Sequence, residues 1–272
     1  MTTLVHRFSR NSIGLLVVLL AGSLSAAQTS NSLGWLDPDG KPLPFQSYVE
    51  VEEFLRTADI VSRERIDEGL NRFQKVLLEK DGIRMHAIFR DDAIFECAAY
   101  ELAKLLGLDT VPPVVERKIQ RTEGTLQAWV ENVNTERVLR ATTGVPPSGG
   151  INRWRWIMLR QNIYIFDNLI YNEDRNIGNI LIEPDWKLWM IDHTRAFRRW
   201  KELMNPEQVQ FAERSLWEKL QTLDETEVRV KLKNFLNPAE MNGLIERKGL
   251  LVDHIQKLID ERGEKDVLFT LR

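Results

Sequence analysis

Three side chains that carry oxygen atoms, Asp174, Asn179 and Asp192, stand in one short stretch of the sequence. Hard divalent cations such as Mg²⁺ prefer oxygen ligands. Asp192 could therefore hold a cation that bridges phosphates, and Asn179 could add a neutral oxygen without overcharging the site. Asp174 could orient an attacking hydroxyl group and accept its proton. Together these residue types indicate phosphoryl transfer from a metal-bound nucleotide.

A buried helix followed by a hairpin is predicted to position these side chains. Apolar residues recur at steps of three and four up to Ile170, which predicts a helix that ends near Tyr171. A loop then carries Asp174, and two apolar segments flank the turn at 183–185. A hairpin centred between residues 185 and 186 would set Asn179 opposite Asp192.

The remaining patterns predict strands in the first half of the chain and helices in the second. Segments 73–78 and 84–89 flank a turn at Lys80-Asp81-Gly82, which is typical of a hairpin. The spacing predicts a helix over 95–105 that Gly107 closes, and a strand over 124–130. The helices expected after Pro206 cover three ranges: 206–222, 224–236 and 238–262, the last broken near Gly249.

The predicted fold class is α+β with two lobes, a strand-rich N-lobe and a helical C-lobe. We place the N-lobe at residues 61–131 and the C-lobe at 132–272. Residues 28–60 contain several glycines and prolines, so we expect a lead-in that follows the surface and lies outside the core.

The composition restricts the possible partners. The chain has 272 residues, of which 43% are hydrophobic and 28% charged, and its formal net charge is −3. That balance argues against a nucleic-acid partner. The single cysteine, Cys97, excludes an intramolecular disulfide, and its apolar neighbours favour a core thiol over a nucleophile.

Residues 1–27 have the pattern of a secretory signal peptide. Basic residues precede an apolar segment from Ile13 to Leu20, and Ser25-Ala26-Ala27 offers small residues before a cleavage point. We therefore expect an exported protein in a periplasm, an extracellular space or a secretory lumen. Two alternatives are an uncleaved membrane anchor over 11–27, the only route to a membrane, and an extension from a misplaced start codon.

The stretch around Asp174 resembles known kinase families. The spacing from Asp174 to Asn179 matches the protein-kinase catalytic loop, and Asp174-Arg175-Asn176-x-x-Asn179 is close to the D-R-H-x-x-N loop of phosphatidylinositol 3-/4-kinases. Segment 166–175 resembles the F-D-x-L-I-x-N-x-D-R segment of the secretory-pathway (Golgi casein-type) kinases. Residues 96–100 and 111–114 resemble the E-I-A-A-F and V-P-P-V blocks of the same kinases. The resemblance covers residues 66–200, and HipA-type bacterial kinases are more distant.

The resemblance implies a role for further residues. Arg90 falls at the position of the lysine that contacts nucleotide phosphates, and Glu96 would be its partner. Gly69 would belong to a loop over the phosphates, and the backbone near Trp129, Val130 and Glu131 would meet adenine. The resemblance thus implies three catalytic residues, Asp174, Arg90 and Glu96, and two metal ligands, Asn179 and Asp192. The implied cofactors are ATP with Mg or Mn, and the partner is a hydroxyl-bearing acceptor, with a protein favoured.

Three departures keep other interpretations open. Arg90 replaces a lysine, Asn176 replaces a histidine, and Asp192-His193-Thr194 lacks the glycine of D-F-G or D-N-G. The preferred interpretation is a kinase, and the first alternative is a nucleotide-binding pseudokinase that acts as a scaffold. The second is an unrelated exported structural protein, in which Asn179 and Asp192 would lie far apart. For Arg90 and Glu96 the alternative to a nucleotide site is a surface ion pair. For Trp129, ordinary core packing is as well supported as a contact with adenine.

Overall fold

The computed structural model describes residues 33–271 except 69, 70, 92, 146 and 148. The chain divides into two units, Met1–Ser30 and Asn31–Arg272, and the description concerns the second. The predicted signal peptide or anchor (residues 1–27) and the predicted phosphate-loop residue Gly69 lie outside the described residues. Among the residues that are described, no helix is long and apolar enough to cross a membrane.

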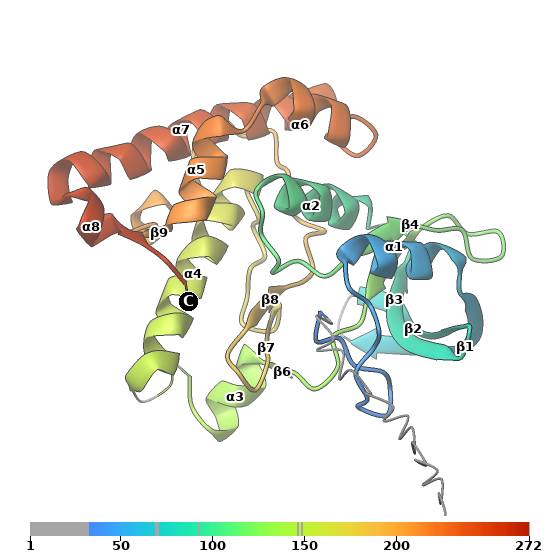
Figure 1. Ribbon diagram of the computed structural model, residues 1–272. Helices are drawn as coiled ribbons and strands as arrows, with labels where there is room; N and C mark the ends of the chain where they lie inside the picture. Colours follow the sequence, from blue (N-terminus) through green and yellow to red (C-terminus); the bar gives the residue numbers. More distant parts are fainter. Residues whose placement is uncertain (1–32, 69–70, 92, 146, 148, 272) are drawn as a thin grey trace, which may run out of the picture. The chain divides into compact units, whose positions relative to one another are not determined.

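An antiparallel sheet of five strands forms the centre of the N-lobe (Figure 1). The predicted hairpin is confirmed, because its turn residues Asp81 and Gly82 both have positive φ, as a tight hairpin requires. The first strand of the sheet was not predicted, since it overlaps the expected lead-in. In spatial order the strands are β1 (Asp59–Glu68), β2 (Asn71–Lys80), β3 (Ile83–Arg90), β5 (Thr125–Ala128) and β4 (Val114–Glu116).

The expected surface lead-in is instead part of the core, so that prediction was wrong. It contains helix α1 (Tyr48–Thr57), which begins where the Ser47 side chain accepts a hydrogen bond from the Glu50 amide. Apolar residues of this segment are buried against the sheet, and the ring centroid of Trp35 lies 5.3 Å from that of Trp189 in the C-lobe. Glycine and proline bend the chain here, but burial of the residues between them decides where it lies.

The C-lobe is built around helix α4 (Gly150–Ile170), which confirms the predicted buried helix. A small sheet in the order β6–β7–β8 stands beside it and carries the predicted hairpin. The strands are β6 (Asn134–Thr135), β7 (Ile180–Ile182) and β8 (Leu188–Met190). The other described elements are α3 (Glu136–Thr142), η1 (Pro206–Gln208), β9 (Ala212–Glu213), α5 (Arg214–Thr222), α6 (Glu225–Leu232), α7 (Pro238–Arg262), α8 (Glu264–Val267) and β10 (Leu268–Phe269).

Two predictions about the C-terminal helices need correction. Residues 206–213 form a short turn of 3-10 helix and a strand, so the helix begins at Arg214 and not at Pro206. Helix α7 runs unbroken through Gly249, because the capping box at Asn237 and burial along the helix outweigh the roughly 1 kcal/mol that one glycine costs.

Helix α2 (Ile94–Leu105) confirms the predicted helix, but its packing differs from the predicted lobe boundary. Its buried side chains, among them Ala98 and Leu102, belong to the same apolar core as α4 and α7. The core of the five-stranded sheet is a separate cluster. Cys97 is buried on this helix, and burial raises the pKa of its thiol to about 12, which agrees with a core thiol.

Candidate functional site

A cavity of about 320 Å³ lies between the sheet of the N-lobe and the β7–β8 hairpin. Strands β3 and β5 supply one wall, and the hairpin with the loop before it supplies the other. Five residues that the sequence nominated line it together: Arg90, Trp129, Val130, Asn179 and Asp192. The structure therefore brings together residues that are far apart in the chain.

The other nominated residues lie around this cavity but are not part of its lining. Glu96 is buried in the first turn of α2, with 1% of its surface exposed. Asp174 lies on the loop between α4 and β7, and 39% of its side chain is exposed. Glu131 follows Val130, and its carboxylate lies 2.5 Å from His86 Nδ1 and accepts a hydrogen bond from Trp129 Nε1 at 3.1 Å.

Arg90 at the end of β3 connects the two buried carboxylates of the site. Its Nη1 donates to Asp192 Oδ1 at 3.1 Å and lies 3.7 Å from Glu96 Oε1. Only 11% of the Arg90 side chain is exposed, which excludes the surface ion pair considered above. Arg90 thus lies nearer to the predicted metal ligand than to its predicted partner.

Glu96 is held mainly by His193, a residue to which sequence reasoning gave no role. The His193 backbone amide donates to Glu96 Oε1 at 2.7 Å, and Nδ1 lies 2.8 Å from Oε2. His193 is fully buried, with its ring edge-on to Phe166. The residue after Asp192, the predicted metal ligand, therefore joins that segment to helix α2.

Both buried carboxyl groups are stabilised in their charged form. Burial by itself would raise the pKa of Glu96, but the interactions with His193 and Arg90 outweigh it and lower that pKa below its usual value. Burial likewise opposes the ionisation of Asp192, whereas Arg90 and the Thr194 hydroxyl, 2.7 Å away, lower its pKa. The site thus keeps two carboxylates charged at neutral pH.

The register of the hairpin differs by one position from the prediction. Ile180 pairs with Met190, and the Ile191 amide donates to the Asn179 carbonyl at 3.2 Å, so Asn179 faces Ile191 and not Asp192. The turn holds three residues, 184–186, and Trp186 has a positive φ of 69°. Asp192 also has a positive φ, 60°, so the regular alternation of the strand ends there. The side chains of Asn179 and Asp192 both line the cavity.

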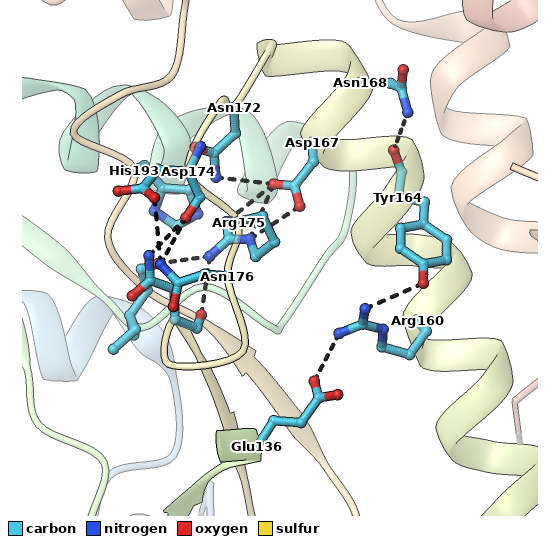
Figure 2. A network of polar contacts seen from close by, with 12 residues as sticks. Glu136, Arg160, Tyr164, Asp167, Asn168, Asn172, Asp174, Arg175, Asn176 and His193 are labelled. Atoms are coloured by element: carbon cyan, nitrogen blue, oxygen red, sulfur yellow. Dashed lines mark hydrogen bonds and ion pairs between the residues drawn. The ribbon is translucent and has the colours of Figure 1, made fainter. Parts of the chain in front are cut away.

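Arg175 fixes the loop that carries Asp174. Its guanidinium pairs with Asp167 of α4 at 3.0 Å and donates through Nη1 to the carbonyls of Asn179 at 3.0 Å and Ile191 at 2.6 Å. Figure 2 shows Asp167 and Arg175 pointing toward each other, with Asn172 beside them. One buried arginine therefore aligns both strands of the hairpin just before the predicted metal ligands.

The loop itself is closed by local hydrogen bonds. Asn179 Nδ2 donates to the Asp174 carbonyl at 2.9 Å, and Asn176 Oδ1 accepts from the Gly178 amide at 2.8 Å. A Cβ atom at Gly178 would meet Asn176 Oδ1 at 2.9 Å and Arg137 Nη2 at 3.0 Å, so a larger residue would push these two side chains aside. Asn176, where the kinase pattern has histidine, thus has a structural role.

A second network attaches helix α3 to α4 below the cavity. Glu136, with no exposed surface, pairs with Arg160 at 2.8 Å, and Arg160 donates to the Tyr164 hydroxyl at 3.2 Å (Figure 2). Sequence reasoning missed these residues because each is an ordinary polar residue on a helix. The network holds the two helices together and does not line the cavity.

Comparisons with known proteins establish the fold. No protein-family model matches the chain, and no curated protein matches it. A solved structure that resembles it is the crystal structure of a Helicobacter pylori proinflammatory kinase, CtkA, with a TM-score of 0.52 and 12% sequence identity. The match covers 76% of this chain and 98% of that chain. The chain therefore has a two-lobed α+β fold of the atypical kinase type, as the sequence predicted.

The residues at the cavity fit a hard divalent cation that takes most of its coordinating atoms from a bound phosphate compound and water. Asp192 and Asn179 offer a charged and a neutral oxygen, the donor types that Mg²⁺ and Mn²⁺ accept. Among the described residues no group of three His, Cys, Asp or Glu side chains forms an all-protein metal cage. Mg²⁺ is commonly bound through one or two protein carboxylates, with phosphates and water as its other ligands.

Proposed function

We propose that this protein is an exported, ATP-dependent phosphotransferase that moves the γ-phosphate of metal-bound ATP to a hydroxyl group, with a protein as the favoured acceptor. The observation that carries the proposal is the shared cavity, where Arg90, Asn179 and Asp192 meet the segment 128–130 at the end of β5. The kinase-like fold and the resemblance to secretory-pathway kinases support it, and the N-terminal pattern supports export.

Each side chain has a physical task in this proposal. Asn179 and Asp192 hold the cation, which neutralises charge on the phosphates when it is bound. Arg90 offers guanidinium donors to phosphate oxygens, a geometry for which arginine is well suited. Asp174, more exposed than the other carboxylates of the site, orients the acceptor hydroxyl and accepts its proton. Glu96 and His193 hold Arg90 and Asp192 in place.

A nucleotide-binding pseudokinase is the second candidate, and the contact between Arg90 and Asp192 favours it. At 3.1 Å the guanidinium already neutralises the carboxylate that a metal ion would need. A cation must therefore displace Arg90 or share Asp192 with it. A protein that never turns over could keep the pair intact and bind nucleotide weakly without metal.

A thermal-shift titration of the full chain tests nucleotide binding. ATP with Mg or Mn at about 100 times its Kd should stabilise the fold by about 2.7 kcal/mol, which raises Tm by roughly 5–10 °C for a chain of this size. Asp192→Asn should abolish the metal-dependent part of the shift. Asp185→Asn in the exposed hairpin turn is the matched control and should keep it. No shift with any nucleotide would refute both candidates.

Transfer of label from γ-labelled ATP then separates the candidates. The phosphotransferase predicts label on the protein itself or on a generic protein acceptor. Asp174→Asn should remove that transfer and leave the thermal shift unchanged, because Asp174 lies outside the cavity lining. A nucleotide-induced shift that does not depend on metal, with no transfer to any acceptor, would establish the pseudokinase.

A further inference from the structure

We propose that Gln127 selects adenine over guanine in the cavity, an inference that rests on the proposed nucleotide-binding function. Gln127 lies on β5, two residues before Trp129, and pairs in register with Ile88 of β3. Its side chain lines the same cavity as Arg90 and Asp192 although only 5% of the residue is exposed. Sequence reasoning gave it no role.

The carboxamide of Gln127 is incompletely satisfied within the protein. Its Nε2 is buried and has no hydrogen-bond partner among the residues that the structure describes. A buried donor without a partner is unfavourable and calls for an explanation, and a bound molecule that accepts its hydrogen bond is one. Rotation about the soft terminal torsion of glutamine can direct either the amide or the carbonyl toward that molecule.

The neighbours of Gln127 suit a flat aromatic ring. The cavity wall includes apolar side chains, namely Ile88, Ala128, Val133 and Leu181. The charged residues in the wall include Arg90 and Asp192. An apolar pocket with few polar groups is typical of a base-binding site, because the ring is buried and the polar groups fix its orientation. Gln127 thus supplies an uncharged polar group beside an apolar base-sized wall.

The donor and acceptor pattern of a carboxamide matches one purine. Adenine offers a donor at N6 beside an acceptor at N7, and glutamine can meet both at once. Guanine offers two acceptors, O6 and N7, so one of its acceptors would face the glutamine carbonyl oxygen. We therefore expect ATP to bind at least about tenfold more tightly than GTP, in line with the discrimination that a bidentate contact gives.

The test compares ATP, GTP and 7-deaza-ATP, an analogue in which carbon replaces N7. Their Kd values with Mg²⁺ are measured for the full wild-type chain and for Gln127→Met, which keeps the length of the side chain and removes its hydrogen bonds. Gln256→Met on the exposed face of α7 is the control. The wild type and the control should prefer ATP over both other nucleotides about tenfold, and Gln127→Met should bind all three within about twofold.

The outcomes separate this inference from the proposed function. If ATP binds but the ratio of ATP to 7-deaza-ATP is the same in the wild type and Gln127→Met, Gln127 does not read the base and the proposed function stands. If no nucleotide binds the wild type, both proposals fail. Should Gln127→Met not fold, equal wild-type affinities for ATP and 7-deaza-ATP would by themselves overturn the inference.

Discussion

Removing the imidazole of His193 should destabilise the protein in a pH-dependent way. His193→Leu keeps a side chain of similar size against Phe166 but deletes the group 2.8 Å from Glu96 Oε2. Glu96 is 1% exposed, so water cannot replace the lost donor. The backbone contact at 2.7 Å and Arg90 at 3.7 Å remain.

The expected loss can be worked out from these contacts. A hydrogen bond to a charged group contributes about 1.5–3 kcal/mol, and an incompletely paired buried carboxylate adds about 1–3 kcal/mol. His193 Nε2 is buried and has no hydrogen-bond partner among the described residues. Removing this unsatisfied nitrogen should offset about 1 kcal/mol of the loss in stability. The free energy of unfolding should therefore fall by about 1.5–5 kcal/mol at pH 7.

The sign of the pH dependence follows from the lowered pKa of Glu96. A carboxyl group whose pKa is lower in the folded protein contributes stability above its unfolded pKa of about 4.3, and this contribution is lost as the pH falls through the folded pKa. In His193→Leu the burial of Glu96 dominates and raises its pKa. The difference between wild type and variant should therefore be largest at pH 7 and shrink toward pH 4.

Urea unfolding of the full chain at several pH values measures this difference. Leu220→Ala is the control, because Leu220 is fully buried on α5 and its truncation costs about 2–5 kcal/mol without any titrating group. The control should lose the same free energy at every pH. A loss in His193→Leu that is equally constant, or below about 1 kcal/mol at pH 7, would refute the role assigned to His193.

Three further variants test other parts of the structure. Arg247→Met removes a fully buried guanidinium and leaves three backbone carbonyls without this donor. At about 1–3 kcal/mol for each unsatisfied buried group, calorimetry should show a loss of at least about 3 kcal/mol, and an unchanged Tm would contradict this. Gly178→Ala should weaken the binding of nucleotide and metal, because the added Cβ would displace the Asn176 side chain, while Tm should change little. Unchanged affinity would show that the loop accommodates the added methyl group. Tyr100→Phe deletes a 2.9 Å hydrogen bond to buried Glu52 and should cost about 1.5–3 kcal/mol in urea unfolding, unless Lys104 alone satisfies that carboxylate.

The sequence could predict the elements whose signal is local. The apolar spacing up to Ile170 identified α4, and Asp81-Gly82 identified the hairpin of β2 and β3. The residue types at Asp192 and Asn179 identified two side chains of one cavity, although their chemical role stays a prediction. Each of these signals depends on neighbours within a few residues or on the chemistry of the side chain itself.

Features decided by tertiary contacts could not be predicted in the same way. The position of Trp35 depends on Trp189, far away in the sequence. The hairpin register depends on a positive φ at Trp186, a residue type that rarely adopts it. Gln127 lies in the predicted strand 124–130, and its place in the cavity wall is visible only once the cavity is known.

The packing of α2 determines how the cavity can open. Its buried face belongs to the core of the C-lobe, and Glu96 is tied to His193, so the helix and the segment around Asp192 should move as one body. Under the proposed function, nucleotide would enter or leave by a swing of the five-stranded sheet over a fixed helix, with Arg90 as the contact that breaks. In a hydrogen-exchange experiment the amides of α2 should share the slow opening of α4, while the strands that carry Arg90 and Gln127 exchange as a separate unit.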